Sequence, residues 1–484
     1  MASDTKRLAV AFLHPDLGLG GAERLVVDAA LGLQKLGHSV DIYTSHYDPS
    51  HCFEETKDGT LRVHCPRPPF PRSIKGKLHI LLAHARQLHL TSHIIRKSAS
   101  KYDVFFVDQL STCVPILRLL AGKRVVFYCH FPDKLLADGA YVEGKSGQQG
   151  SLLKRLYRMP MDWLEEVTTS QADVIIANSK FTASVFKKHF RSIRVNPRVI
   201  YPGVNLSAYE SSPDWDDPDV RQVVSDRPTL LSLNRFEKKK NTALAVDSFA
   251  LFRRRLSEQS SIPMETLRLV IAGGYDPRLE DNMMTLVGLI DRAKAKSLSY
   301  TIIQPSSSKV TIPPFNMKPE NPDIILLLNF TTAQRSALLS SASTLALLYT
   351  PTNEHFGIGP IEGMVSGLPV LACDSGGPTE SIIDSPASER TGWLRPPDEN
   401  LWADALVEIV SLSKDERALL AGRGRSRARE MFGMDAMALS LEDALREAVA
   451  LGPVPGVGAL TPLLGFLLAF LLGLVLNSLL GRST

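Results

Sequence analysis

The sequence predicts an α/β fold with two doubly wound, Rossmann-like domains and a C-terminal transmembrane helix. Short apolar runs alternate with helical patterns along most of the chain, which is typical of parallel sheets buried on both faces. Several of these runs end in glycine-rich loops that open the next helix, as in nucleotide-binding sheets. An uncharged apolar run at residues 459–480 is long enough to span the hydrocarbon core of a bilayer.

The composition is that of a large globular protein. The chain has 484 residues, enough for two or three domains, and its 44% hydrophobic and 22% charged residues indicate a sizeable core. A formal net charge of +4 gives no reason to expect a nucleic-acid partner. The five cysteines are scattered without a Cys-x-x-Cys, so we expect neither a disulfide framework nor a zinc site. The polar N-terminus lacks the layout of a signal peptide, and we expect the soluble part in the cytosol.

The first predicted domain covers residues 1–205 and opens with a strand at 8–13, a glycine-rich loop, a helix at 22–36 and a strand at 40–44. Gly20 and Gly21 in that loop let a ligand approach the backbone, and the helix start offers N–H donors to a phosphate. A tight turn that needs glycine for its own geometry is the alternative explanation.

A basic amphipathic helix is predicted at residues 74–97, after an irregular stretch at 52–71. Its positive charges, Arg86 among them, suit an anionic membrane surface or the solvated side of an ordinary surface helix. We expect its histidines on the polar face: His79, His84, His89 and His93.

Further buried strands are predicted at residues 104–107, 125–128 and 174–177. His130 follows the second of these, where it can reach a ligand as a proton donor or base, or simply cap a turn. A second basic amphipathic helix is expected at 151–169, with Trp163 packed into the core.

The second predicted domain covers residues 206–433 and repeats the alternation of strands and helices. Its strands are expected at residues 229–233, 267–272, 324–328, 344–349 and 370–372. Residues 304–322 form a Ser- and Pro-rich insertion that predicts a surface loop. A closing helix and linker at 434–458 then lead to the transmembrane segment.

Residues 349–378 combine two acids with a second glycine-rich loop. Glu354 lies in the loop after a buried strand, and Glu362 lies in the first turn of the next helix, so both can face the carboxyl edge of a parallel sheet. Gly376 and Gly377 open a further helix, whose backbone N–H groups suit an anion. The alternative is an ordinary strand–loop–helix unit in which the acids cap helices.

Basic residues follow the first strand of the second domain. Arg235 and Lys240 stand between the carboxyl end of that strand and the start of the next helix. This position suits the diphosphate of a nucleotide.

The two acids and the Gly-Gly-Pro loop resemble the donor-site signature of the family 4 retaining glycosyltransferases. The resemblance extends from about Leu8 to about Gly433. It is closest to the members that build the dolichol-linked oligosaccharide for N-glycosylation. Four motifs carry it: H-P-D-L-G at residues 14–18, G-G-A-E-R-L at 20–25, Y-C-H-F-P-D at 128–133 and N-E-H-F-G at 353–357.

The resemblance implies the GT-B arrangement, with the two domains facing one cleft, the second holding the nucleotide sugar and the first the acceptor. It implies GDP-mannose as donor and Man1GlcNAc2-diphosphodolichol as acceptor, with an α-1,3 and then an α-1,6 mannose added at one site. The place of action would be the cytosolic face of the endoplasmic reticulum membrane, with other mannosyltransferases of the pathway as candidate partners. We expect no cofactor and no obligatory metal.

The resemblance also implies roles for the site residues. Glu354, His355 and His130 would be catalytic. Glu362 would hold the ribose, and Asp133 would lie on the acceptor side. The donor diphosphate would be bound by Arg235, Lys240, Gly20, Gly21, Gly376 and Gly377.

Three alternatives remain open at this point. The first is a family 4 glycosyltransferase with another sugar or acceptor. The second is a nucleotide-sugar epimerase, which would share the two-domain fold and release a free sugar without needing the membrane segment. The third is a non-catalytic membrane scaffold, which would not need Glu354, Glu362, Arg235 and Lys240 together.

Overall fold

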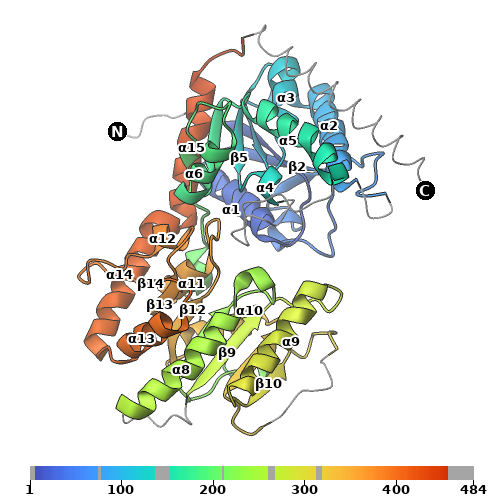
Figure 1. The fold of residues 1–484 in the computed structure, drawn as a ribbon. Helices are drawn as coiled ribbons and strands as arrows, with labels where there is room; N and C mark the ends of the chain where they lie inside the picture. The colour runs from blue at the N-terminus through green and yellow to red at the C-terminus, as the bar shows by residue number, and fades with distance from the viewer. Residues whose placement is uncertain are drawn as a thin grey trace. The chain divides into compact units, whose positions relative to one another are not determined.

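The computed structural model describes residues 6–74, 78–136, 152–209, 212–259, 267–311 and 319–455. The chain forms two compact units (Figure 1). The first combines the residues up to Gly203 with those from Met434 onward, and the second is the continuous segment Val204–Gly433. No helix within the described ranges has the length and apolarity needed to cross a bilayer. The predicted transmembrane segment, residues 459–480, lies outside these ranges.

The first unit is built on a parallel seven-stranded sheet with the order β3-β2-β1-β4-β5-β6-β7. The chain moves from β1 outward to β3 and then returns to the other side of β1, so the switch point lies between β1 and β4. The strands are β1 Ala9–His14, β2 Ser39–Thr44, β3 Arg62–His64, β4 Val104–Asp108, β5 Arg124–Cys129, β6 Val174–Ala177 and β7 Arg198–Val199.

Helices cover both faces of this sheet. On one face, α1 and α15 pack against the strands and against each other; a Cβ at Gly32 would lie 2.7 Å from the Cβ of Ala438, so glycine permits this close approach. Helices α2, α3 and α6 cover the other face with residues such as Leu90 and Phe186. The helices are α1 Gly21–Lys35, α2 His79–Lys97, α3 Val114–Ala121, α4 Asp133–Leu136, α5 Leu152–Thr169, α6 Lys180–His189 and α15 Met434–Ala450, with short turns η1 Glu54–Thr56 and η2 Ala99–Lys101.

The second unit contains a parallel sheet with the order β10-β11-β9-β8-β12-β13-β14. Its switch point lies between β8 and β12. The strands are β8 Thr229–Leu233, β9 Arg268–Gly273, β10 Tyr300–Ile303, β11 Ile324–Leu328, β12 Thr344–Tyr349, β13 Val370–Cys373 and β14 Trp393–Arg395. The helices are α7 Pro218–Arg221, α8 Ala243–Gln259, α9 Glu280–Ala295, α10 Thr332–Ser340, α11 Gly359–Ser366, α12 Pro378–Ser381, α13 Glu399–Val410 and α14 Lys414–Phe432, with turns η3 Leu206–Tyr209 and η4 Lys238–Lys240.

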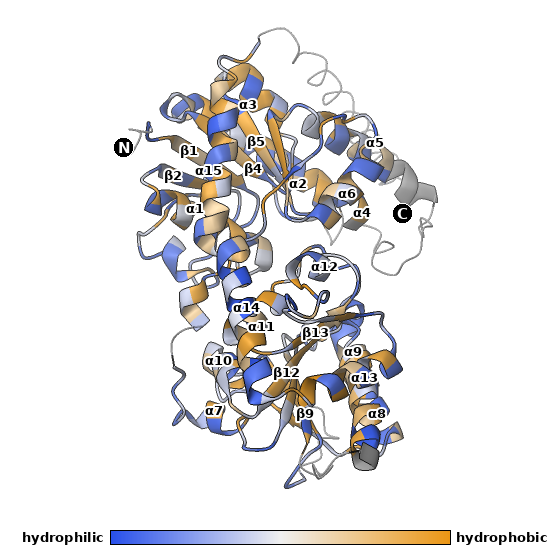
Figure 2. Ribbon diagram, turned by 90° about the vertical axis from the view of Figure 1, so that its left-hand side faces the viewer, coloured by the Kyte–Doolittle hydropathy of each residue, from blue (hydrophilic) through white to orange (hydrophobic). Residues whose placement is uncertain are grey.

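The hydropathy pattern explains why these strands are central. Figure 2 shows β4 and β5 in the hydrophobic colour between helices of mixed character. Strands buried on both faces read as continuous apolar runs. The predicted strands at residues 174–177, 229–233, 324–328 and 344–349 are confirmed with the same bounds.

Helix α2 differs from the prediction of a basic surface helix. It begins at His79, and the predicted irregular stretch before it contains η1 and β3. His84 is buried, with Nδ1 2.6 Å from Thr112 Oγ1, and burial lowers its pKa to about 4. Arg86 is also buried and donates to Asp16 Oδ1 at 3.2 Å and to the Ser45 carbonyl at 2.9 Å. The surface assignment was wrong for both residues, because α2 packs on the sheet and also against α3.

Trp163 on α5 was predicted to be buried, but it lies at the surface. Its side chain is 47% exposed, so the expectation of core packing was wrong. The core of this region is filled instead by Leu164 and Met161. The amphipathic pattern identified the helix but not which of its apolar residues turns inward.

Candidate active site

Arg235 follows β8 at the carboxyl edge of the second unit's sheet. The backbone after β8 continues to pair with the end of β9. The Asn234 N–H donates to the Ala272 carbonyl and the Phe236 N–H donates to the Gly274 carbonyl, each at 3.0 Å. A Cβ at Gly273 would lie 1.7 Å from the Asn234 carbonyl oxygen, so glycine is required for this approach. The Arg235 side chain is 63% exposed, and its guanidinium lies 3.6 Å from Glu237 Oε1. Its backbone is therefore fixed while its charge faces solvent.

Lys240 and Glu354 form an ion pair across the switch point between β8 and β12. Lys240 Nζ donates to Glu354 Oε2 at 2.6 Å, and the side chains are only 17% and 23% exposed. Thr350 Oγ1 also donates to the Lys240 carbonyl at 2.7 Å, which ties the two loops together. Burial alone would raise the pKa of Glu354, but the Lys240 ammonium lowers it below its ordinary value. Glu354 is therefore a carboxylate at neutral pH. Neighbouring His355 is half-buried, and its charge also lowers the pKa of Glu354.

Gly376 and Gly377 hold the loop that carries Glu354. Gly376 has a φ of +70° and forms a parallel bridge with Glu354, and Gly377 N–H donates to the Glu354 carbonyl at 2.8 Å. A Cβ at Gly377 would lie 2.0 Å from the Phe356 carbonyl oxygen. The two glycines thus position the acid. The Gly377 N–H, expected to be open to an anion, is already bonded within the protein.

Glu362 lies in the first turn of α11 with different partners. Its Oε1 accepts from the Tyr209 hydroxyl at 2.5 Å and from Arg335 Nη1 at 3.1 Å. Tyr349, the last residue of β12, is a common neighbour of both acids: burial raises its pKa well above the ordinary value, and the charges of Glu354 and Glu362 raise it further. The two predicted acids are thus near one buried ring, but each has its own cation.

The glycines after Glu354 make room for that ring. A Cβ at Gly357 would lie 2.9 Å from the Tyr349 hydroxyl, and one at Gly359 would lie 2.8 Å from the ring carbons. Gly357 also has a φ of +86°, a conformation that favours glycine. The G-I-G sequence at residues 357–359 is therefore a packing requirement of Tyr349.

In the first unit, one carboxylate joins two histidines at the sheet's carboxyl edge. His14 ends β1, Asp108 ends β4, and His130 follows β5. His14 Nδ1 lies 2.8 Å from Asp108 Oδ2, and His130 Nε2 lies 2.9 Å from the same oxygen. Although burial opposes it, the Asp108 carboxylate raises the pKa of His14 to about 10. His14 is 1% exposed and Asp108 is fully buried. Because its pKa is raised to about 10, His14 is protonated beside the Asp108 carboxylate at neutral pH.

The predicted glycine-rich loop lies beside this network. A Cβ at Gly20 would lie 2.2 Å from Glu23 Oε2, so glycine leaves room for the Glu23 carboxylate at the start of α1. Glu23 Oε1 is in turn 4.0 Å from His14 Nε2. A Cβ at Gly21 would meet open space. The start of α1 therefore already faces a carboxylate of the protein.

Asp133, expected on the acceptor side, begins the short helix α4. Its N–H donates to Glu165 Oε1 at 2.7 Å, and its carboxylate accepts from Arg158 Nη1 at 3.4 Å. Burial, together with the Asp133 charge, raises the pKa of Glu165 to about 7. Asp133 is therefore held through its backbone as well as its side chain.

The structure brings together Lys240, Glu354, Gly376 and Gly377, while Arg235 and Glu362 have separate partners. Sequence reasoning assigned no role to five residues that define the environment of the predicted ones: His14, Asp108, Tyr209, Arg335 and Tyr349. A signal existed for Asp108, which is an acid directly at the end of an apolar strand. The partners of Glu362 come from segments distant in sequence and carry no such signal.

Comparison with known proteins identifies the class. Residues 19–208 match the family model of Glycosyltransferase Family 4, and residues 318–427 match that of Glycosyl transferases group 1. The fold is similar to that of sucrose-phosphate synthase from Thermosynechococcus elongatus, with a TM-score of 0.66 at 19% identity over 92% of this chain and 100% of that one. Two Rossmann-like units with parallel sheets and these matches define a glycosyltransferase of the GT-B fold.

Two curated relatives identify the family. The alpha-1,3/1,6-mannosyltransferase ALG2 of Rhizomucor pusillus is 44% identical over 90% of this chain and 91% of its own length. The corresponding protein of Schizosaccharomyces pombe is 41% identical over 92% of this chain and 83% of its own length. The chain belongs to the alpha-1,3/1,6-mannosyltransferase ALG2 family. The prediction of a mannosyltransferase of lipid-linked oligosaccharide synthesis is confirmed.

Proposed function

We propose that the chain transfers mannose from GDP-mannose to Man1GlcNAc2-diphosphodolichol, first in α-1,3 and then in α-1,6 linkage, to give Man3GlcNAc2. The reaction takes place on the cytosolic face of the endoplasmic reticulum membrane. Membership of the mannosyltransferase family supports the sugar and the two linkages. The observation that best supports the assignment of the donor site is the Lys240–Glu354 ion pair at the switch point between β8 and β12.

That pair offers both charges that donor cleavage needs. When the C1–O bond of the donor breaks, negative charge grows on the diphosphate and positive charge grows on the sugar ring. Lys240, assisted by exposed Arg235, stabilises the diphosphate, and Glu354 stabilises the ring. Because Lys240 has mobile donors on a flexible stem, it can serve Glu354 and a phosphate oxygen together.

The remaining residues complete the proposed site. Glu362, held by Tyr209 and Arg335, accepts hydrogen bonds from the ribose hydroxyls. His355 and His130 act near the reacting sugar, and Asp133 lies on the acceptor side. The glycines let the donor approach the backbone closely. At Gly20 and Gly21, that approach requires the Glu23 carboxylate to turn away from the start of α1.

We propose that residues 459–480, outside the described ranges, anchor the protein in the membrane. The support is the sequence alone, an uncharged apolar run of sufficient length. A chain ended near residue 458 is expected to keep GDP-mannose binding. Loss of donor binding in that truncated chain would show that the segment belongs to the fold.

The direct test uses the purified full chain in lipid with GDP-mannose and a synthetic Man1GlcNAc2-diphospholipid. The expected product gains two hexose masses, and linkage analysis finds α-1,3 before α-1,6. UDP-glucose and GDP-glucose in parallel reactions test the donor. Transfer of another sugar, addition to another acceptor only, or no turnover with any donor would each overturn the proposal.

A further inference from the structure

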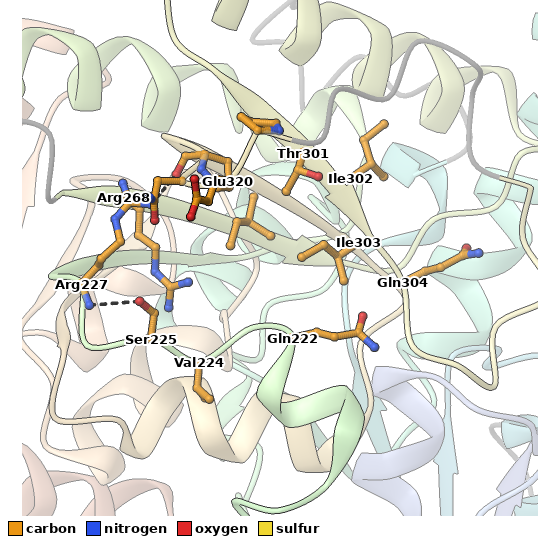
Figure 3. A pocket seen from close by; sticks show the side chains of 14 residues that line it. Gln222, Val224, Ser225, Arg227, Arg268, Thr301, Ile302, Ile303, Gln304 and Glu320 are labelled. Atoms are coloured by element: carbon orange, nitrogen blue, oxygen red, sulfur yellow. Dashed lines mark hydrogen bonds between the residues drawn. The ribbon is translucent and has the colours of Figure 1, made fainter.

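A polar cavity lies in the second unit, away from the Lys240–Glu354 pair. It has a volume of about 550 Å³ and lies beside the amino ends of β9 and β11 and the edge strand β10 (Figure 3). Residues 319–322 and Gln304, at the two ends of the Ser- and Pro-rich insertion, form part of its wall. Asp219 fixes this region by accepting from the Ser306 N–H at 2.8 Å and from Ser306 Oγ at 3.0 Å. Nothing in the proposed donor or acceptor site uses this cavity.

Arg268, the first residue of β9, brings a buried positive charge to the cavity. It is 4% exposed, and it donates from Nε to Thr229 Oγ1 and from Nη2 to the Val223 carbonyl, each at 2.8 Å. Both acceptors are neutral, and no carboxylate among the described residues lies within ion-pair distance of it. Burial and the nearby Arg227 lower its pKa to about 10, so it is still charged at neutral pH. A buried cation that meets only neutral oxygens gains strongly from an anion.

Arg227 adds a second guanidinium to the same wall. It donates to the Pro322 carbonyl at 2.9 Å and to the Leu267 carbonyl at 3.2 Å. Figure 3 shows Arg227 and Arg268 on the same side of the cavity. Glu320 is exposed and is the sole acid among the lining residues. The carboxylate of nearby Asp323 is engaged by Arg253 and Ser299.

We propose that this cavity binds a small organic phosphate. A phosphate monoester carries nearly two negative charges at neutral pH, which match two guanidinium groups better than a single carboxylate does. The volume falls in the range of small-molecule sites and exceeds the needs of a bare phosphate ion. Amide and hydroxyl side chains suit the hydroxyl groups of the ester, and they are Gln222, Ser225, Thr301, Gln304 and Asn321.

The binding test uses the full chain in detergent with saturating GDP, so that the donor site is filled. Calorimetric titrations compare glucose 6-phosphate, glycerol 3-phosphate, inorganic phosphate and neutral glucose at constant ionic strength. We expect one equivalent of a phosphate ester to bind at least tenfold more tightly than inorganic phosphate, and glucose not to bind. Absence of saturable ester binding, equal binding of bare phosphate, or loss of the signal whenever GDP is present would overturn the proposal.

Two substitutions with opposite expected effects locate the site. Arg227→Gln should weaken ester binding at least tenfold, whereas Glu320→Gln should strengthen it about two- to tenfold, because a like charge is removed from the wall. Arg254→Gln and Glu430→Gln, at exposed positions of the same unit that do not line the cavity, are the matched controls. Because a folding defect cannot strengthen binding, unchanged or weaker binding in Glu320→Gln would count against the site. Equal affinities in Arg227→Gln and the parent would overturn it.

Discussion

The two sheets place ionisable groups at equivalent edges but hold them differently. In the first unit, Asp108 is fully buried and is shared by His14 and His130. In the second, Lys240 pairs with Glu354 and Arg335 pairs with Glu362, and both acids keep some contact with solvent. The first edge is a closed network in which each charge depends on the others. The second consists of separate pairs that can exchange a partner for a ligand.

The comparison indicates which edge contributes more to stability and which holds its charges in pairs that a ligand can separate. Breaking a buried pair by removing one partner leaves an uncompensated charge in low dielectric, which is strongly destabilising. A partly exposed pair loses less, because water can solvate the remaining group. Substitutions at the first edge should therefore lower stability most, and those at the second should lower activity most.

The largest effect is expected from Asp108→Asn. His14 would lose the carboxylate that keeps it charged, at a cost of about 3–5 kcal/mol. The folded-state pKa of His14, about 10, lies above its ordinary 6.5, so its contribution to stability is complete below pH 6.5 and is lost as the pH rises through 10. Urea unfolding at pH 6 and pH 9 should show that slope in the parent chain but not in the variant. Asp435→Asn, at an exposed ion pair with Lys35, is the control and should change stability by less than about 0.5 kcal/mol.

Lys240→Met tests the second edge. Both mannose additions should slow together by roughly ten- to a hundredfold, since the donor is common to both and a charge-assisted bond contributes about 1.5–3 kcal/mol. Lys239→Met is the matched control, because Lys239 is exposed and pairs with Glu237. Adding Glu354→Gln to Lys240→Met should restore stability without restoring turnover. A variant that lost only the second mannose would assign Lys240 to the acceptor.

Glu354→Ala and Glu362→Ala should each have an effect about as large as that of Lys240→Met. The two substitutions should differ in whether kcat or KM changes. Contacts with the ribose change little during the reaction, so loss of Glu362 should mainly raise KM for GDP-mannose. Glu354 faces the charge that grows in the transition state, so its loss should mainly lower kcat. Steady-state kinetics of both variants, with circular dichroism as the check on folding, measure the difference. Equal KM defects with unchanged kcat would contradict the separate roles.

Tyr349→Phe should have the smallest effect. The ring and its packing against Gly357 and Gly359 remain, and only a hydroxyl near two acids is removed. We expect a stability change of about 1 kcal/mol or less and nearly unchanged kcat. Thermal melting and steady-state rates measure both quantities. A large loss of kcat would show that the hydroxyl orients Glu354 for the reaction.

The sequence predicted the central strands well, but it did not predict the sheet edges. Strands β3, β7, β10 and β14 were all missed, and they are the four edge strands. Most are short or polar, such as Arg62–His64 and Arg198–Val199, because one side of an edge strand stays unpaired. Each edge strand is held extended by pairing with its neighbouring strand, and the local sequence pattern contains no signal for that pairing. Glu354 and Lys240 were predicted separately, while their pairing depends on β8 and β12 being neighbours.

The return of the chain to the first unit constrains the order of folding during synthesis. Met437, Leu441 and Leu445 of α15 complete the core around α1, and the Gly203 N–H donates to Met437 Sδ. At ribosomal rates, the intervening segment 204–433 takes roughly 10 to 50 s to make, and the apolar face beneath α15 stays uncovered throughout. The second unit is continuous and can fold within that interval. The unit that begins the chain is therefore expected to be the last to reach its native structure.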